Sequence, residues 1–325
     1  MEHGQADKGN PLTARDTESL ESASAVDISH RRGILQTGDG VRLAWQTWTP
    51  TNPRAVIVLV HGMAEYSSRY RETACYLAAE GIAIITGDLR GHGLSEDGSH
   101  PGRVHVDQFT DYFHDVEALL RHAEERHKGL PLFILGHSMG GLISLSYSLE
   151  RPQKLNGAII SSPALGSHPD IRPPLLLQWL VNAFSRLTPR LKFNSNLDNN
   201  ALCRDPLVVK ACNEDPLISH TVSARWFVEL LAAMKRAHTG ASGLRIPMLL
   251  MQSGADRVVD PTATIKWADA APPSEVELVV WDGLYHEMFN EPEKEQVREK
   301  VLLWLDRQLT KPNTAQAPNP GQERE

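Results

Sequence analysis

Runs of β-branched and other apolar residues recur along the chain, and each run has the length of a single strand. Residues 55–60 read AVIVLV without a polar interruption, which is typical of a strand buried on both faces. Residues 41–48 instead alternate apolar and polar positions after a turn at residues 37–40, which predicts a hairpin over residues 33–48. Further apolar runs occupy residues 82–86, 132–135, 157–160, 247–251 and 276–281.

Segments with helical periodicity separate these runs. They cover approximately residues 67–80, 107–128, 138–150, 261–271 and 292–310. Because strands that alternate with helices form parallel sheets, the pattern predicts an α/β fold in which helices cover both faces of one sheet.

The alternation stops between residues 166 and 243, a segment rich in Pro, Asn and Leu. We interpret this segment, called the cap below, as an insertion after the sixth strand. Since α/β sheets bind ligands at the carboxyl ends of their strands, the cap is expected to lie over that end. The predicted organisation is a core over residues 31–165 and 244–310, the cap at 166–243, and polar, loosely ordered tails at 1–30 and 311–325.

Composition narrows the classes of function. The chain has 325 residues, which suffices for one large α/β domain with an insertion. Its net charge of −7 disfavours a nucleic-acid partner. The three cysteines, Cys75, Cys203 and Cys212, are too few and too scattered for a disulfide framework or a zinc site. No residue cluster has metal-ligand spacing, so the sequence predicts neither a metal nor a cofactor.

Two absences in the sequence bear on location. The segment Met1–Lys8 lacks the apolar stretch of a signal peptide. No part of the chain reaches the ~18 consecutive apolar residues of a membrane span. We therefore expect a soluble, cytoplasmic protein. Nothing in the pattern specifies an oligomeric state.

Candidate chemistry begins with Gly136-His-Ser-Met-Gly140, which reads G-x-S-x-G. An apolar run precedes this pentapeptide and a helical pattern follows it, and this strand, turn and helix are the context of a nucleophile elbow. Glycines are needed on both sides because strand and helix pass closely there. The turn would expose the Ser138 hydroxyl and aim the backbone N–H of Met139 at a developing oxyanion.

A serine nucleophile needs a general base and a carboxylate that holds the base. In elbow proteins the acid and then the histidine follow the serine along the chain. His286 is the one histidine after residue 239, and it directly follows a predicted strand. Asp256 is the favoured acid because it lies in a tight turn after the preceding strand. Asp260 precedes a proline and is expected to cap the next helix, and Asp282 is a third candidate.

The loop at residues 61–66 is expected to supply the second oxyanion donor. Gly62 permits an unusual backbone turn there, and the N–H of Met63 is the candidate donor. The Gly-rich loop at residues 88–95 lacks the spacing of a phosphate cradle and is interpreted as a scaffold loop. Three histidines near these loops are expected to be structural: His61, His92 and His137.

Several motifs together resemble one known group, the α/β-hydrolases of the monoacylglycerol lipase and lysophospholipase type. The likeness runs from about residue 33 to residue 310. The motifs that carry it are His61-Gly-Met-Ala-Glu-Tyr-Ser-Ser-Arg-Tyr70, Asp88-Leu-Arg-Gly-His-Gly-Leu-Ser95, Gly136-His-Ser-Met-Gly-Gly141, Ser253-Gly-Ala-Asp-Arg257, Tyr285-His286 and, in the cap, residues 203–207 and 213–218.

The resemblance implies an α/β-hydrolase fold, with a mostly parallel eight-stranded sheet flanked by helices and a helical cap inserted after strand 6. It also implies that Glu65 and Arg69 shape the polar end of the substrate pocket. The roles it implies for the other site residues agree with those above: Ser138 as nucleophile, Asp256 as acid, His286 as base, and the Met63 and Met139 amides as oxyanion hole.

Two positions depart from the group. The monoacylglycerol lipases of animals tend to carry a tyrosine where this chain has Cys212, and a histidine where it has Phe289. Both residues are thought to serve the polar head group. Bacterial relatives known only as lysophospholipases are as similar, so the resemblance leaves the head group open.

The cap is more apolar than packing on a sheet requires. Residues 174–184 are apolar nearly all round, and residues 222–234 carry a large apolar face. One apolar stripe suffices for a helix that packs on a core. The excess predicts either a tunnel for an acyl chain or a surface for transient contact with a membrane. The alternative is that the cap helices pack on each other.

The resulting expectation is a serine hydrolase that cleaves esters of single-chain lipids, a monoacylglycerol first, through an acyl-enzyme on Ser138. Lysophospholipase and general carboxylesterase activity are the alternatives. An iminopeptidase would need cap carboxylates such as Glu214 and Asp215. Asp215 precedes a proline, however, and is interpreted as the boundary of a helix. Dehalogenases and epoxide hydrolases carry aspartate at the nucleophile position, so Ser138 excludes them. The alternative outside the enzymes is a binding protein built on a hydrolase scaffold.

Overall fold

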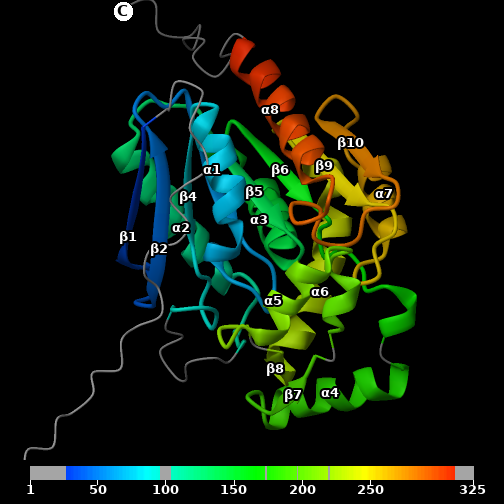
Figure 1. Cartoon of the computed structure of the whole chain (residues 1–325). Coiled ribbons are helices and arrows are strands. Elements are labelled where there is room, and N and C mark those ends of the chain that lie inside the picture. The colour runs from blue at the N-terminus through cyan, green and yellow to red at the C-terminus, as the bar shows by residue number, and fades with distance from the viewer. Residues whose placement is uncertain (1–26, 96–103, 173, 196, 219, 312–325) are drawn as a thin grey trace, which may run out of the picture.

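The computed structural model describes residues 27–311 except 96–103, 173, 196 and 219, and its centre is one sheet (Figure 1). Eight strands form this sheet: β1 (Ile28–Gln36), β2 (Arg42–Pro50), β3 (Ala55–Val60), β4 (Ile82–Gly87), β5 (Leu132–His137), β6 (Gly157–Ser161), β9 (Met248–Ser253) and β10 (Val276–Trp281). Their order is β1-β2-β4-β3-β5-β6-β9-β10. Only the β1–β2 and β2–β4 pairs of this sheet are antiparallel. The predicted mostly parallel, eight-stranded α/β sheet is confirmed.

Helices cover both faces of the sheet (Figure 1). One face packs against α1 (Arg71–Ala79) and α8 (Lys294–Thr310). The other face packs against α2 (Asp111–Arg126), α3 (Met139–Glu150) and α7 (Pro261–Ala270).

The two-sided burial explains why β3 reads as an unbroken apolar run. Its successive side chains alternate between the two apolar clusters: Ile57 and Leu59 contribute to one, Val56 and Val58 to the other. Because side chains of a strand point to opposite faces in turn, a strand covered on both faces needs an apolar residue at every position.

The two edges of the sheet differ from the sequence prediction. β1 begins at Ile28, inside the segment predicted to be a tail, because exposed side chains on an edge strand need not be apolar. Residues 1–26 and 312–325 of the predicted tails lie outside the described residues. β10 forms the other edge, and its residues are half-buried or exposed rather than buried, because it pairs with β9 alone.

The cap lies between β6 and β9 in the chain and below the sheet in Figure 1. Its helices are α4 (Leu175–Leu187), α5 (Pro206–Glu214) and α6 (Ala224–Gly240). A two-stranded antiparallel pair, β7 (Lys192–Asn194) with β8 (Thr221–Ser223), was not predicted. These strands have three residues each, which is too short for a recognisable period of two. Within the described residues, no helix combines the length and apolar character needed to span a membrane.

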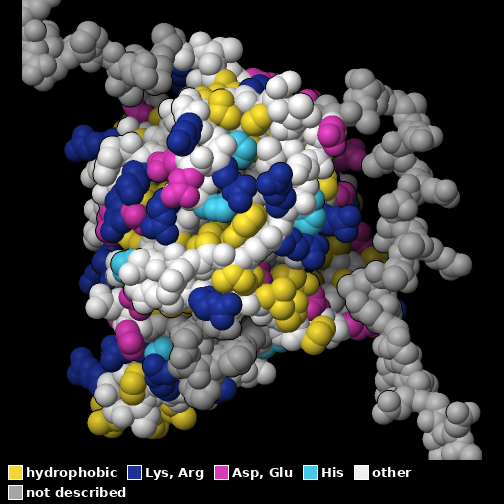
Figure 2. All heavy atoms as spheres, turned by 90° about the vertical axis from the view of Figure 1, so that its left-hand side faces the viewer, with side chains coloured by type: hydrophobic (Ala, Val, Ile, Leu, Met, Phe, Trp, Pro, Cys, Tyr) yellow, Lys and Arg dark blue, Asp and Glu magenta, His cyan; other side chains and the backbone are white. Residues whose placement is uncertain are grey.

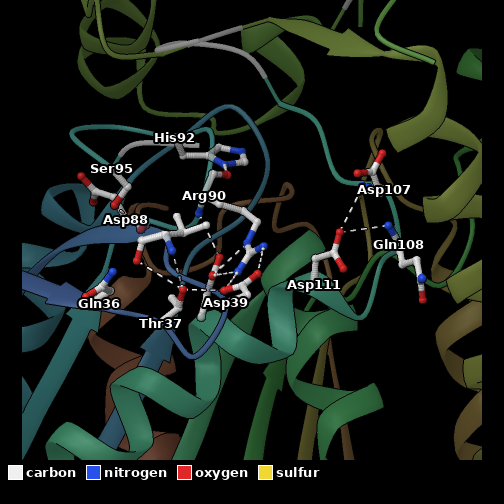
Figure 3. Close-up of polar contacts among 12 residues, drawn as sticks. Gln36, Thr37, Asp39, Asp88, Arg90, His92, Ser95, Asp107, Gln108 and Asp111 are labelled. Atoms are coloured by element: carbon white, nitrogen blue, oxygen red, sulfur yellow. Dashed lines mark hydrogen bonds and ion pairs between the residues drawn. The ribbon is translucent and has the colours of Figure 1, made fainter. Parts of the chain in front are cut away.

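The loop after β4 is held by polar contacts of its own, as predicted for a scaffold loop (Figure 3). Asp88 accepts hydrogen bonds from the N–H of Leu94 (2.8 Å) and of Ser67 (2.9 Å). The Arg90 guanidinium pairs with Asp39 (2.7 Å) and with the fully buried Asp115 (2.6 Å). The loop therefore ties the β1–β2 hairpin to α2.

Candidate active site

The nucleophile turn connects β5 to α3. Ser138 has φ 54° and ψ −118°, a backbone conformation that costs a non-glycine residue free energy and persists only when its surroundings enforce it. A Cβ built on Gly136 would lie 2.3 Å from the carbonyl oxygen of Gly140, and one on Gly140 would lie 2.2 Å from that of Val60. The predicted steric reason for both glycines is confirmed.

Three side chains that are distant in sequence meet at the carboxyl ends of the parallel strands. His286 Nε2 lies 2.8 Å from Ser138 Oγ, and His286 Nδ1 lies 2.8 Å from Asp256 Oδ2. The other Asp256 oxygen accepts hydrogen bonds from the N–H groups of Val258 (2.8 Å) and Val259 (2.9 Å). The predicted serine, histidine and aspartate therefore form one hydrogen-bonded chain.

The position of Asp256 separates the three acid candidates. Asp260 caps α7, where its side chain accepts a hydrogen bond from the Thr262 N–H at 3.0 Å, as predicted. Asp282 follows β10 and packs beside Gly254. Among these three carboxylates, and within the described part of the chain, only Asp256 forms a hydrogen bond with the ring of His286.

The surroundings set the charges of these groups. Burial lowers the pKa of His286, but the carboxylates of Asp256, Glu287 and Glu65 together outweigh burial and raise the pKa of the ring. Burial would raise the pKa of Asp256, but His286 and two backbone N–H groups lower it below its usual value. A carboxylate that stays ionised fixes the proton of the neutral ring on Nδ1, which leaves Nε2 free to accept the Ser138 proton.

The loop at residues 61–66 lies against the nucleophile. A Cβ built on Gly62 would lie 3.1 Å from Ser138 Cβ, so a side chain at position 62 would crowd the nucleophile. Ala64 in the same loop has φ 57°. Met63, one residue after Gly62, is half-buried, and Met139 opens α3 directly after Ser138. Both predicted oxyanion donors therefore belong to backbone adjacent to the nucleophile.

The predicted structural histidines make structural contacts. His61 Nδ1 lies 2.7 Å from the Gly62 carbonyl oxygen, and His61 Nε2 accepts a hydrogen bond from the Leu89 N–H at 2.9 Å. His92 Nδ1 lies 3.0 Å from the Arg90 carbonyl oxygen. These contacts fasten the 61–66 loop to the loop after β4.

His137, the third histidine expected to be structural, packs against the ring of His286. Its ring centroid lies 4.7 Å from that of His286, and its Nδ1 lies 3.2 Å from Ser161 Oγ. Burial and the neighbouring His286 lower the pKa of His137 to about 3. The ring is therefore a neutral packing partner of His286 at neutral pH.

Glu65 and Arg69 form one buried cluster with residues that were not predicted. The Arg69 guanidinium binds Glu287 through two hydrogen bonds (2.6 and 2.7 Å) and Glu65 at 3.1 Å. It also donates to the Cys212 sulfur at 2.8 Å, and Tyr70 donates to Glu65 at 2.9 Å. No spacing in the sequence links position 69 to position 287. The one signal in the sequence that could have indicated Glu287 is that it directly follows His286.

The two positions that depart from the animal lipases have different surroundings. Cys212 lies on α5 and contacts Arg69. Phe289 is buried in the apolar cluster beneath α1 and α8. At this position the chain carries a core side chain.

The cap helices use their apolar faces differently. On α6, Trp226, Met234 and smaller apolar residues are buried in the main core cluster. On α4, large apolar side chains are exposed, among them Leu176 (71%), Trp179 (67%) and Leu187 (80%). Packing on the core therefore accounts for the apolar face of α6, whereas packing does not account for the exposed apolar side chains of α4.

A hollow of about 600 Å³ lies at the boundary between cap and core, next to Tyr285. Its lining mixes polar or charged residues with apolar ones, so it lacks the apolar character predicted for an acyl tunnel. The lining residues are Asn200, Cys203, Arg204, Pro206, Val209, Lys210, Asn213, Glu214 and Tyr285.

The chain is similar to known proteins over most of its length. A family model described as serine aminopeptidase, S33, matches residues 51–293. The phospholipase YtpA of Bacillus subtilis is 35% identical over 265 residues, which cover 81% of this chain and 99% of that protein. The monoacylglycerol lipase of Mycolicibacterium smegmatis is 34% identical over 275 residues, which cover 82% of this chain and 93% of that protein.

A solved structure extends the similarity to three dimensions. The crystal structure of the Paleococcus ferrophilus monoacylglycerol lipase matches with a TM-score of 0.73 and 29% sequence identity, and the match covers 82% of this chain and 99% of that one. Ser138, Asp256 and His286 all lie within the residues that the family model matches.

Proposed function

From the premise that the chain belongs to the α/β-hydrolase family described as serine aminopeptidase, S33, and is a carboxylic ester hydrolase, we propose that it cleaves a monoacylglycerol through an acyl-enzyme on Ser138. The observation that carries the proposal is the hydrogen-bonded chain from Ser138 through His286 to Asp256. A relative that is 34% identical is named a monoacylglycerol lipase.

In the first half of the reaction, His286 Nε2 takes the Ser138 proton while Ser138 Oγ attacks the ester carbonyl carbon. The Asp256 carboxylate stabilises the imidazolium that forms. The backbone N–H groups of Met63 and Met139 donate to the oxyanion, and each such donor is worth about 3 kcal/mol of transition-state stabilisation. His286 then gives its proton to the leaving alkoxide, so glycerol departs and the acyl group stays on Ser138.

In the second half, His286 takes a proton from water, whose oxygen attacks the acyl carbon. Collapse of the second tetrahedral intermediate breaks the bond to Ser138 Oγ, and His286 returns the proton to the serine. The products are a fatty acid and glycerol, and the enzyme is regenerated. Glu65 and Arg69 shape the polar end of the site beside this chemistry.

The cap carboxylates do not support a peptidase of the iminopeptidase type. Asp215 accepts hydrogen bonds from the Tyr66 hydroxyl (2.7 Å) and from the Leu217 N–H (2.9 Å). It directly follows α5, in agreement with the predicted helix boundary. Glu214 is exposed on α5. A free amino terminus needs ionised carboxylates that are not already engaged.

Peripheral association with a lipid surface is the second part of the proposal. Helix α4, which carries the exposed apolar side chains, lies at the lower end of the molecule in Figure 1. Figure 2 shows hydrophobic and basic side chains together at the same end. The exposed cations Arg186, Arg190 and Lys192 flank the patch, whereas the chain as a whole carries −7. A basic, apolar helix face favours an anionic membrane.

Fatty-acid release from monooleoylglycerol and from oleoyl-lysophosphatidylcholine, measured side by side, tests the substrate. Ser138→Ala serves as the blank, and covalent labelling by a fluorophosphonate reports whether Ser138 is activated. We expect the glycerol ester to be preferred, Ser138→Ala to lose activity by at least about 10⁴-fold, and only the wild type to be labelled.

The other outcomes separate the parts of the proposal. Preference for the phospholipid would favour the lysophospholipase alternative, in line with the relative named phospholipase YtpA. Labelling without activity on either ester would reject the substrate and retain the triad. Full activity of Ser138→Ala would reject the mechanism.

A further inference from the structure

Arg69 connects three separate parts of the molecule. One of its terminal nitrogens donates to Glu65 (3.1 Å) and to Glu287 (2.6 Å). The other donates to Glu287 (2.7 Å) and to the sulfur of Cys212 (2.8 Å). Each terminal nitrogen of a guanidinium carries two hydrogens. All four are therefore engaged by protein groups.

Each partner of Arg69 belongs to a part of the site. Glu65 accepts a hydrogen bond from the Gly62 N–H at 2.5 Å, within the loop that presents Met63. Glu287 directly follows His286, and its own N–H binds the Leu202 carbonyl oxygen in the cap at 2.8 Å. Arg69 thus contacts the loop at residues 61–66, called the oxyanion loop below, and the loop at residues 282–293, called the histidine loop below. Through Cys212 it also contacts helix α5.

The cluster is too buried and too well paired to release its arginine at low cost. Glu65, Glu287 and Cys212 are each at most 5% exposed, and the Arg69 side chain is 12% exposed. Breaking a buried ion pair leaves an uncompensated charge in a medium that solvates it poorly. A substrate head group would have to displace one of these partners to reach a terminal N–H of Arg69.

We propose that the Glu287–Arg69 pair is a positioning device, which holds the histidine loop, the oxyanion loop and α5 in register, and that Arg69 is not itself a ligand of the substrate head group. This inference rests on the proposed roles of Ser138 and His286. It predicts that loss of the pair slows the chemical step on every ester, whatever its alcohol.

The charge of Glu287 gives the pair a second measurable effect. The carboxylates that face His286 are Asp256, Glu287 and Glu65, and all three raise the pKa of the ring against the effect of burial. His137 also faces the ring but stays neutral, and Arg69 is the cation beyond Glu287. Neutralising Glu287 removes a negative charge and exposes His286 to Arg69, so the pKa of His286 falls.

The test is Glu287→Gln in the full chain, assayed as kcat/KM against pH on monooleoylglycerol and on methyl oleate. We expect kcat to fall about 10- to 100-fold on both esters, since small misplacements of catalytic groups cost that much. The acidic limb of the profile, where His286 becomes protonated, should move about half a pH unit to lower pH. The preference between the two esters should stay as in the wild type.

Glu291→Gln is the matched control. Glu291 is buried on the same loop and pairs with Arg204 of the cap, accepting its backbone N–H at 2.7 Å, but it does not contact Arg69. The Glu291→Gln variant should have a lower melting temperature than the wild type, but the acidic limb of its pH profile should not move. If Glu287→Gln fails to fold, Cys212→Ala carries the test, with an equal loss of kcat on both esters expected.

Three results would overturn the inference. In the first, Glu287→Gln keeps the wild-type kcat and the wild-type acidic limb of the pH profile. In the second, Glu291→Gln shifts the acidic limb as much as Glu287→Gln does. In the third, Glu287→Gln or Cys212→Ala loses kcat on the glycerol ester alone. Failure of the proposed function is distinguishable, because the wild type would then lack activity on monooleoylglycerol or Ser138→Ala would retain activity in the same assays.

Discussion

At the residue scale, the strongest constraint is the space around Ser138. The backbone of the nucleophile turn is strained, and neighbouring main-chain atoms leave no room for a Cβ on either flanking glycine. This constraint can be inferred from the G-x-S-x-G pattern, because glycine is the one residue that permits such close approach. The same pattern gives no information about the ring of His137 that packs on His286.

Gly140→Ala should prevent the native turn. The new methyl group would meet the Val60 carbonyl oxygen at 2.2 Å, and backbone atoms cannot move aside cheaply, so we expect a loss of several kcal/mol in the free energy of unfolding and no fluorophosphonate labelling. Gly243→Ala is the control, because no described atom outside the adjoining residues lies within 4 Å of its added Cβ. Urea unfolding of both variants checks this, and equal midpoints would contradict the steric argument.

Asp256→Asn should abolish most activity while Asp260→Asn should not. The Asp256 carboxylate lies 2.8 Å from His286 Nδ1, and an amide in its place would favour the wrong tautomer, at a cost of about 10⁴ in kcat. Asp260 caps α7, and because Asn caps a helix about as well as Asp, Asp260→Asn should leave both kcat and stability nearly unchanged. The two kcat values and melting temperatures decide between the acids, and an inactive Asp260→Asn with an active Asp256→Asn would reverse the assignment.

At the scale of elements, exposure separates helices whose sequences look equally apolar. α6 buries Trp226 and Met234 in the core, whereas α4 leaves Trp179 and Leu187 exposed. The sequence identified the excess of apolar residues in both segments. It could not say which helix lies outside, because that depends on the path of the chain through the cap.

The exposed face of α4 should bind anionic vesicles. A buried Trp or Leu side chain contributes about 1.5–3 kcal/mol, so Trp179→Glu with Leu187→Glu should weaken binding at least about 100-fold. Leu303→Glu is the control, since Leu303 on α8 is also largely exposed (53%). Sedimentation with phosphatidylcholine vesicles that contain phosphatidylglycerol measures this. Equal binding of all three proteins would reject the docking face.

At the scale of the whole molecule, several ion pairs join elements that are far apart in sequence. Arg90 pairs with Asp39 of the β1–β2 hairpin (Figure 3) and with Asp115 of α2. Arg69 pairs with Glu287 and reaches the cap through a hydrogen bond to Cys212. Such pairs hold the relative placement of elements, and they make stability depend on pH.

The free energy of unfolding should fall as the solution is acidified. Burial opposes ionisation of Glu287 and Asp39, but their arginine partners lower each pKa to about 2, from usual values of 4.5 and 3.8. A carboxylate with a depressed pKa stabilises the fold above its usual pKa, and this contribution disappears as the pH falls toward the depressed value. The loss should therefore lie between about pH 4.5 and pH 2.

Urea midpoints at pH 7, 4 and 3 measure this loss. Asp39→Asn should reduce the pH dependence by at most about 1 kcal/mol, because Asp39 is partly exposed and solvent screens its pair with Arg90. The wild type and the variant should converge at the lowest pH. A midpoint that rises on acidification would contradict the sign.

The sequence by itself determined the α/β class, the order of strands and helices, the cap as an insertion, and the candidates Ser138, Asp256 and His286. Those features depend on local patterns, such as apolar periodicity, a strained turn that requires glycine, and the order of residues along the chain. Only the tertiary structure decided that Glu287 and Cys212 share the guanidinium of Arg69, that His137 packs on His286, and that α4 rather than α6 is exposed. These are contacts between segments separated by many residues, or consequences of the chain's path, and no local periodicity encodes them.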